Sequence, residues 1–230
     1  MRTMRMSWLL MILGLLFLTG CSVEQEKVDP NSYHKFEGLP LTVLNIPVAR
    51  FKSNCYIAYD PKTLDAVVID PGGEAEKIIS LAKENKLKVK KIILTHGHGD
   101  HTKAASEVKK ATKAEVLIHS NDASILYEIT ADRFLTDGEK IPVGGQTLTV
   151  VCTPGHTPGG ITLVSEGLAF TGDTLFNCGM GRTDLPGGSK EALDSSIKYL
   201  LFNLPPSTRI FPGHKTDSTI GAEKSRYFSE

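Results

Sequence analysis

The chain has 230 residues, 26 basic and 26 acidic side chains, and 40% hydrophobic residues. This length and apolar content suffice for one sizeable hydrophobic core and do not require a second domain. Because the charges balance, no basic field predicts a nucleic-acid partner, and no long acidic tail predicts disorder.

The first twenty residues have the pattern of a signal peptide. Arg2 and Arg5 form a basic head, and the apolar run over residues 8–18 is shorter than the roughly 20 residues of a membrane span. The run ends in Leu18-Thr19-Gly20-Cys21, which resembles the processing site of bacterial lipoproteins. The resemblance implies cleavage before Cys21, lipidation of Cys21, and a lipid anchor in a bacterial cell-envelope membrane, with the protein on its extracytoplasmic side. Ordinary secretory cleavage and an uncleaved anchor are the alternatives.

Residues 21–38 are polar and aperiodic, which predicts a tether that leads to a single domain over residues 39–230. A first group of predicted elements comprises strands at 41–48, 55–59 and 66–69, a helix at 74–86, a strand at 91–94, a helix at 102–111, a strand at 115–119 and a short helix from residue 121. A second group comprises strands at 146–152, 161–164, 169–171 and 209–211, with a helix over 190–202. Two groups of strands, each flanked by helices, predict two sheets packed face to face with helices outside.

The stretch His96-Gly97-His98-Gly99-Asp100-His101 directly follows the strand predicted at 91–94. Imidazole and carboxylate ligands together suit borderline divalent metals such as Zn²⁺, and also Fe²⁺ or Mn²⁺. The two glycines allow the backbone to turn sharply, so that the ligand side chains can converge. Three histidines and an aspartate within six residues therefore predict a metal site.

Three further candidate ligands follow later predicted strands, each beside a glycine. They are His156 in the segment 153–160, Asp173 in the segment 171–174, and His214 in the segment 211–214. Loops at one end of a sheet scaffold bring together side chains from distant parts of a chain. The repeated order of strand, glycine and ligand predicts that these residues belong to the same site as the first group.

The complete set resembles the metallo-β-lactamase-fold hydrolase superfamily over roughly residues 40–225. This resemblance implies an α/β (α+β) protein with a four-layer αββα sandwich that holds two divalent metal ions. By motif match, the first ion is held by His96, His98 and His156, the second by Asp100, His101 and His214, and Asp173 bridges both. His119 has no counterpart in the set and is expected to be structural.

Shorter matches indicate the glyoxalase II-like branch. Asn54-Cys55-Tyr56 and the segments 66–72, 171–176 and 181–188 are similar to short, single-domain bacterial hydrolases of that branch. The similarity implies a thioesterase with a small-molecule thioester substrate, a metal-bridging hydroxide, and two ions that are zinc, or alternatively iron or manganese. It also implies that Asp100 and Asp173 take part in catalysis and that Arg182 binds the substrate.

The chain departs from the glyoxalase II pattern at several positions, including Lys215 and Arg226-Tyr227. Asp184 stands where an aromatic residue is expected, two positions after Arg182. Only sixteen residues follow His214, so the helical domain that holds glutathione in classical glyoxalase II is not expected. These departures place substrate recognition in question, and a carrier thiol other than glutathione is an alternative.

Other functions stay open on the sequence alone. Related persulfide dioxygenases hold one Fe²⁺ with two histidines and an aspartate, which here are His96, His156 and Asp173. A metal-bound envelope protein without catalytic activity is a third possibility. Lactone or β-lactam hydrolysis is a minor variant of the hydrolase, although a common type of metallo-β-lactamase has a cysteine in place of Asp173.

Overall fold

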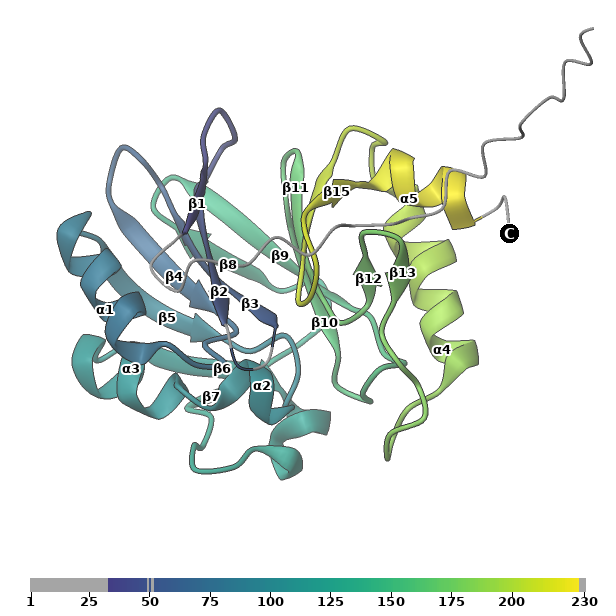
Figure 1. Ribbon diagram of the computed structural model, residues 1–230, viewed down its shortest axis with the longest axis horizontal. Helices are drawn as coiled ribbons and strands as arrows, with labels where there is room; N and C mark the ends of the chain where they lie inside the picture. Colours follow the sequence, from purple (N-terminus) through teal and green to yellow (C-terminus); the bar gives the residue numbers. More distant parts are fainter. Residues whose placement is uncertain (1–32, 49, 51, 228–230) are drawn as a thin grey trace, which may run out of the picture.

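The computed structural model describes residues 33–48, 50 and 52–227. Over that part of the chain, two β-sheets pack face to face, and helices cover the outer face of each sheet (Figure 1). The predicted signal peptide, Cys21 and most of the predicted tether lie outside the described residues. Among the helices that are described, none has both the length and the apolar character needed to cross a membrane.

The first sheet contains seven strands that neighbour one another in chain order. The first four strands are antiparallel, and the last four run parallel, so helices supply the crossover connections. The strands are β1 (His34–Phe36), β2 (Thr42–Val48), β3 (Ser53–Tyr59), β4 (Asp65–Ile69), β5 (Lys88–Ile93), β6 (Glu115–His119) and β7 (Arg133–Leu135). The connecting helices are α1 (Ala75–Glu84), α2 (Gly99–Thr102), α3 (Ala105–Thr112) and the 3₁₀ turn η1 (Ser120–Ile125).

The second sheet has the strand order β15-β14-β11-β10-β9-β8, in which only β11 and β14 are parallel neighbours. Its strands are β8 (Lys140–Val143), β9 (Gln146–Cys152), β10 (Ile161–Ser165), β11 (Leu168–Gly172), β14 (Arg209–Pro212) and β15 (Ser218–Thr219). A small hairpin is formed by β12 (Leu175–Phe176) and β13 (Gly179–Met180). The helical segments are α4 (Lys190–Ser195), the π-helical turn η2 (Ser196–Leu200), the 3₁₀ turn η3 (Leu201–Asn203) and α5 (Ile220–Tyr227).

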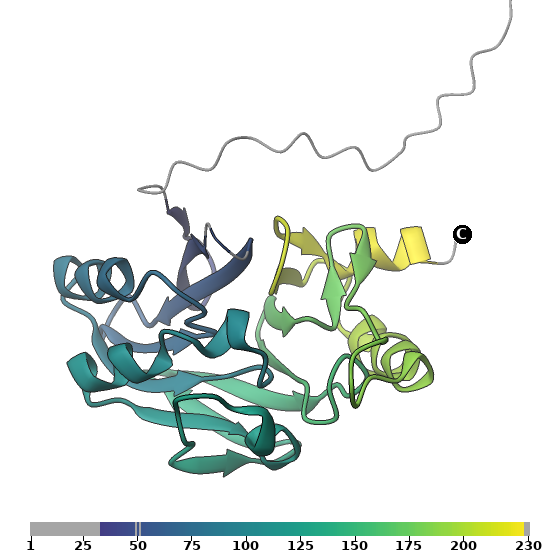
Figure 2. The same cartoon turned by 60° about the horizontal axis from the view of Figure 1, so that its bottom comes forward.

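Three apolar layers hold these elements together. The middle layer lies between the two sheets and includes the stacked rings of Phe170 and Phe211. A second layer joins the first sheet to α1 and α3, and a third joins the second sheet to α4 and α5. Figure 2 shows the blue and teal helices on one side of the molecule and the green and yellow helices on the other, with the sheets between them. The predicted four-layer αββα sandwich is therefore confirmed.

Several local expectations differ from the structure. The helix predicted at 190–202 is α4 followed by the turns η2 and η3. The helix predicted at 102–111 is divided into α2 and α3, because the N–H of Ala104 donates to the carbonyl oxygen of Pro71 and leaves the helical pattern. The sheet also begins inside the predicted tether, since residues 34–36 pair with β2 as the edge strand β1. Phe36 secures this strand by packing edge-on against Phe211, with ring centroids 5.1 Å apart.

Candidate metal centre

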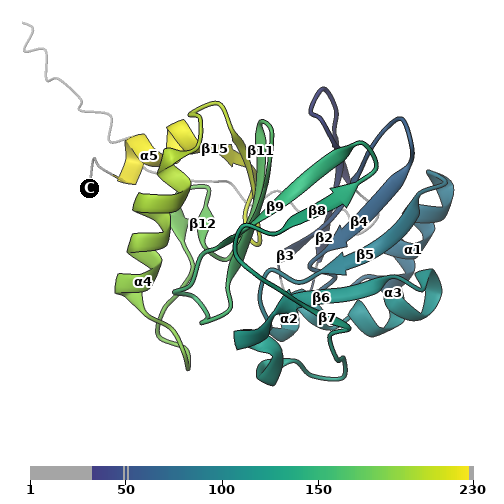
Figure 3. The same ribbon diagram turned by 180° about the vertical axis from the view of Figure 1, so that it is seen from behind.

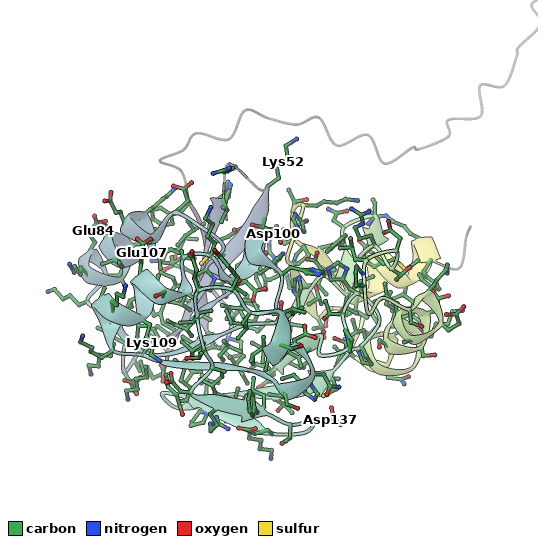
Figure 4. All side chains as sticks on the ribbon, turned by 90° about the horizontal axis from the view of Figure 1, so that it is seen from below. Lys52, Glu84, Asp100, Glu107, Lys109 and Asp137 are labelled. Carbon is green, nitrogen blue, oxygen red and sulfur yellow. The ribbon has the colours of Figure 1, made fainter. Side chains whose placement is uncertain are left out.

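The predicted ligands gather where strands from both sheets end. α2 follows β5 of the first sheet and carries Asp100 and His101. Asp173 follows β11 and His214 follows β14, and these two strands are parallel neighbours, so their carboxyl ends lie at the same edge of the second sheet. His156 lies in the connection between β9 and β10. Figure 3 shows the two sheets from behind, and Figure 4 labels Asp100 at the junction of the two halves.

Three of the predicted ligands form a first half-site. The donor atoms of His96, His98 and His156 lie within 4.8 Å of one another. Nδ1 of His98 is 2.9 Å from Nε2 of His156. His96 and His156 are buried and His98 is half-buried, so this group of nitrogens is largely shielded from water. The structure thus brings together the three residues predicted to hold the first metal.

A second half-site lies beside the first. The donor atoms of Asp100, His101 and His214 also lie within 4.8 Å of one another. Nε2 of His214 is 3.3 Å from Oδ2 of Asp100 and 3.4 Å from Nε2 of His101. His101 is fully buried, whereas Asp100 and His214 are partly exposed and form the open side of this half-site.

Asp173 lies between the two half-sites. Its Oδ2 is 3.5 Å from Nε2 of His156 in the first half-site and 3.5 Å from Nε2 of His214 in the second. Its Oδ1 is 3.4 Å from Nε2 of His101. One carboxylate therefore contacts donors of both half-sites, which is the position expected of a bridging ligand.

Two buried atoms in the centre support metal binding. Nε2 of His96 and Oδ1 of Asp173 are buried and have no hydrogen-bond partner among the described residues, although Oδ1 of Asp173 faces Nε2 of His101 at 3.4 Å. A buried polar atom without a partner costs free energy, and a metal ion provides the missing interaction for a nitrogen or carboxylate lone pair. A set of imidazoles and carboxylates fits Zn²⁺, Fe²⁺ or Mn²⁺. The residues present therefore fit the metals implied by the ligand pattern.

The first half-site favours neutral imidazoles. Burial lowers the pKa of His96 well below its ordinary value, and the neighbouring His101 and His156 lower it further. Burial also lowers the pKa of His98, with His156 adding to the effect. A neutral imidazole keeps a lone pair available for coordination. This half-site can therefore accept a cation without first losing protons from these two rings.

In the second half-site, neighbouring carboxylates raise the pKa values of the histidines. Although burial alone lowers the pKa of His101, the carboxylates of Asp173 and Asp70 outweigh it and raise the pKa to about 9. His214 responds in the same way, because its hydrogen bond with Asp100 raises its pKa against the effect of burial. Burial raises the pKa of Asp100, but the stronger combined effect of His214 and His101 lowers it to about 2. Positive charge is thus favoured here in the metal-free protein.

Backbone and carboxylate acceptors orient the histidine rings. Nδ1 of His156 lies 2.7 Å from the carbonyl oxygen of Arg182, and Nδ1 of His214 lies 2.9 Å from that of Lys52. Nδ1 of His101 lies 3.1 Å from Oδ2 of Asp70, a buried carboxylate. An acceptor at one ring nitrogen fixes the tautomer and leaves the other nitrogen free to bind a metal. In each of these three rings, the remaining Nε2 faces the centre.

Asp70 was not among the predicted site residues. Its Oδ1 accepts the N–H of Thr95 at 2.7 Å, and its Oδ2 accepts the Thr95 hydroxyl at 2.6 Å. The sequence suggested only that Asp70-Pro71-Gly72-Gly73 ends a strand. Yet Asp70 directly follows the apolar strand β4, which is the same order of strand and polar residue that identified the ligands. That signal could have found it.

The segment Ser53-Asn54-Cys55-Tyr56 at the start of β3 supports the second half-site. The Ser53 hydroxyl donates to the carbonyl oxygen of Asp100 at 2.7 Å. The Asn54 N–H donates to the carbonyl oxygen of Gly213, also at 2.7 Å. Gly213 permits a close approach, because a Cβ atom there would lie 2.2 Å from Oδ1 of Asp173. The motif therefore holds the loops of two ligands in place.

Arg182 contributes to the centre through its backbone. Its side chain is exposed and forms two hydrogen bonds with the carboxylate of Asp184, at 2.7 and 2.6 Å. The guanidinium group of Arg182, which was predicted to bind the substrate, is thus paired with Asp184, which stands where the family has an aromatic residue. His119 lies apart from the ligand clusters and caps η1, with its Nδ1 accepting the N–H of Asn121 at 3.3 Å.

An αββα sandwich with histidine and aspartate donors at the junction of its sheets defines a metallo-β-lactamase-like protein. A family model described as the metallo-beta-lactamase superfamily matches residues 48–214. The chain belongs to this superfamily.

Individual relatives differ in their named activities. Hydroxyacylglutathione hydrolase GloC of Haemophilus influenzae is 38% identical over 198 residues, which cover 78% of this chain and 93% of the relative. The crystal structure of the BLEG-1 B3 metallo-beta-lactamase has 33% identity and a TM-score of 0.76, covering 80% of this chain and 96% of that one. ETHE1 from Myxococcus xanthus has 31% identity and a TM-score of 0.73, covering 78% and 80% of the two chains.

Proposed function

We propose that this superfamily member is a metal-dependent thioester hydrolase of the glyoxalase II type. The observation that carries the proposal is the complete pair of half-sites, with Asp173 in contact with donors of both. The similarity to GloC supports a hydrolase, because that relative is named as a hydroxyacylglutathione hydrolase.

Two divalent ions held by these residues would act as Lewis acids towards a carbonyl oxygen and would lower the pKa of a water molecule towards neutrality. His96, His98 and His156 would hold one ion, and Asp100, His101 and His214 the other. Asp173 would contact both and fix their separation. We infer zinc as the metal, with iron or manganese as alternatives, because the nitrogen and carboxylate donor set accommodates all three.

The surrounding residues would keep the reaction geometry fixed. Asp70 and the carbonyl oxygens of Arg182 and Lys52 hold three of the rings at their outer nitrogens. Asp100 is partly exposed and lies 3.3 Å from His214. With its pKa lowered to about 2 it stays ionised at neutral pH, so its main role would be that of a metal ligand. A thiolate is a good leaving group, so cleavage of a thioester requires no strong general acid.

Substrate recognition would involve Arg182 and Asp184 together. A guanidinium group can bind a substrate carboxylate in fork geometry, but Asp184 occupies that fork here. An anionic substrate must therefore compete with Asp184 for the guanidinium group. This competition favours thioesters that carry less negative charge near the site.

An oxygenase related to the persulfide dioxygenases is the second candidate. The likeness to ETHE1 favours it, and His96, His156 and Asp173 would be its iron ligands. The intact second half-site favours the hydrolase, because a mononuclear enzyme does not need Asp100, His101 and His214 as ligands. Hydrolysis of lactones or β-lactams remains a variant of the first proposal, and the BLEG-1 likeness makes a β-lactam a necessary member of the substrate panel.

Metal analysis and a substrate screen test the proposal together. Purified, tag-free protein is analysed for metal content and assayed with a thioester panel that includes S-lactoylglutathione, beside a lactone, a β-lactam and a persulfide. We expect two zinc ions per chain and thioester hydrolysis without oxygen uptake. One iron per chain with oxygen uptake would support the oxygenase instead. A chain that binds metal but turns over no substrate would favour the non-catalytic alternative.

We also propose that Cys21 carries a lipid anchor and that the domain works on the extracytoplasmic side of a bacterial membrane. The support is the apolar run that ends in Leu18-Thr19-Gly20-Cys21. A Cys21→Ala variant should lose incorporation of labelled fatty acid and leave the membrane fraction. Unchanged labelling in this variant would refute the anchor.

A further inference from the structure

A second buried carboxylate lies close to the metal centre and belongs to neither half-site. Asp122 is located in η1, the short turn after β6, and its side chain has 0% exposure. Asp122 lies in the short helix predicted from residue 121 and was not among the predicted site residues. A fully buried carboxylate is costly unless its oxygens are satisfied, so its partners indicate what it does.

The two oxygens of Asp122 bind two different ligand loops. Oδ2 accepts the N–H of Gly97 at 3.0 Å, and Oδ1 accepts the N–H of Gly159 at 2.6 Å. Gly97 lies between His96 and His98, whereas Gly159 lies three residues after His156. The first loop follows β5 of one sheet, and the second connects β9 and β10 of the other. One carboxylate therefore joins the two loops that carry all three donors of the first half-site.

Both loops pack directly against the turn that contains Asp122. A Cβ atom at Gly159 would lie 2.6 Å from Oδ1 of Asp122, and one at Gly97 would lie 2.9 Å from its carbonyl oxygen. Asn121 adds a further link, since its Nδ2 donates to the carbonyl oxygen of Pro158 at 3.3 Å. Because Asp122 contacts the backbone of both loops directly, a substitution at Asp122 should shift these backbones themselves.

We propose that Asp122 is a positioning residue that sets the separation of His96 and His98 from His156 and so controls metal affinity in the first half-site. The inference rests on the proposed function to the extent that the centre binds metal. The site requires a carboxylate because two N–H donors need two acceptor oxygens. An asparagine offers one oxygen, and its NH₂ group would face the other donor.

Asp122→Asn is the test variant, and Asp60→Asn is a matched control. Asp60 is also a buried carboxylate that joins two turns, accepting the N–H of Lys62 at 2.8 Å and that of Gly145 at 2.7 Å. It follows the end of β3, whereas Ser53 at the start of that strand contacts Asp100. Asp60 therefore lies at the opposite end of the sheet from the metal centre. Both variants lose one acceptor for a backbone N–H, but only one does so beside the ligand loops.

The measurement is Zn²⁺ binding by the metal-free proteins in competition with a chromogenic chelator, together with their thermal unfolding. For Asp122→Asn we expect one of the two ions to bind about 10–100-fold more weakly, as is typical when an outer partner of a metal ligand is lost. The Asp60→Asn protein should unfold at a lower temperature but bind both ions within about twofold of the wild type. Wild-type affinity for both ions in Asp122→Asn, or an equal loss in the control, would overturn the proposal.

Amide hydrogen exchange of the wild-type protein provides a second test, which decides the matter if Asp122→Asn does not fold. The Gly97 and Gly159 amides should be protected even without metal, because Asp122 holds them. Exchange of both at the rate of exposed amides would refute the positioning role. If the wild-type chain binds no metal, the proposed function and this inference both fail. If it binds metal and Asp122→Asn matches it, only the inference fails.

Discussion

Replacement of Asp70 by asparagine tests how the second half-site is organised. Asp70 accepts three hydrogen bonds, from the Thr95 N–H, the Thr95 hydroxyl and Nδ1 of His101. An asparagine keeps one oxygen and replaces the other with an NH₂ donor. If the NH₂ faces His101, Nδ1 must become an acceptor, and the ring proton moves to Nε2, the atom needed for metal. The opposite orientation would set the NH₂ group against the Thr95 N–H, which cannot accept a hydrogen bond, so we expect the NH₂ group to face His101.

This arrangement should weaken the second metal more than the first. Loss of an outer partner of a metal ligand typically costs about 10–100-fold in affinity, which corresponds to about 1.4–2.8 kcal/mol at 1.4 kcal/mol per tenfold change. The hydrogen bonds that Asp70 makes as a charged acceptor are each worth about 1.5–3 kcal/mol, so the two magnitudes agree.

Calorimetric titration of the metal-free Asp70→Asn protein with Zn²⁺ measures this effect. We expect two binding events, one of which is weakened by the factor given above while the other is retained. The Asp60→Asn protein again serves as a control for general loss of stability. Two events with wild-type affinities would show that Asp70 does not orient His101, and the reasoning from ring tautomers would be refuted.

Three further predictions concern the ligands and the substrate. Asp173→Ala should abolish turnover and lower the metal content measured by elemental analysis; full activity would contradict the bridging role. With a pKa raised to about 9, His101 is protonated at neutral pH in the metal-free protein, so metal uptake should release a proton. Titrations in buffers of different ionisation enthalpy detect this released proton. The affinity for metal at the second half-site should accordingly increase with pH up to about 9. Asp184→Ala frees Arg182 and should modestly raise kcat/KM for anionic thioesters, because an exposed ion pair contributes little; an equal rise for neutral thioesters would refute the pairing argument.

Much of the fold could be predicted because its strands are short apolar runs bounded by turn residues. β2, β3 and β11 were found in this way, since both faces of each strand are covered and nearly every residue is buried. The division between α2 and α3 could not be predicted. It depends on a hydrogen bond from Ala104 to Pro71, two residues that lie far apart in the sequence.

The candidate site shows the same limit. The ligand-type residues were recognisable because histidine and aspartate carry their chemistry in the side chain and follow strands with glycine nearby. Asp70 and Asp122 act by accepting hydrogen bonds from loops brought to them by the fold. The sequence around Asp122 contains no motif, so its place between Gly97 and Gly159 is visible only in three dimensions. The Arg182–Asp184 pair was likewise noticed as a departure and not as an interaction.

The position of the centre between the sheets has a consequence for the lifetime of the protein. Each half-site draws donors from both halves of the chain, and His101 and His214 are 113 residues apart. Metal ions bound there would act as removable cross-links between the two halves, so their binding free energy would add to the resistance of the domain to opening. A chelator should then expose the ligand loops to proteases as well as stop turnover. The abundance of the protein would follow the metal supply of its surroundings.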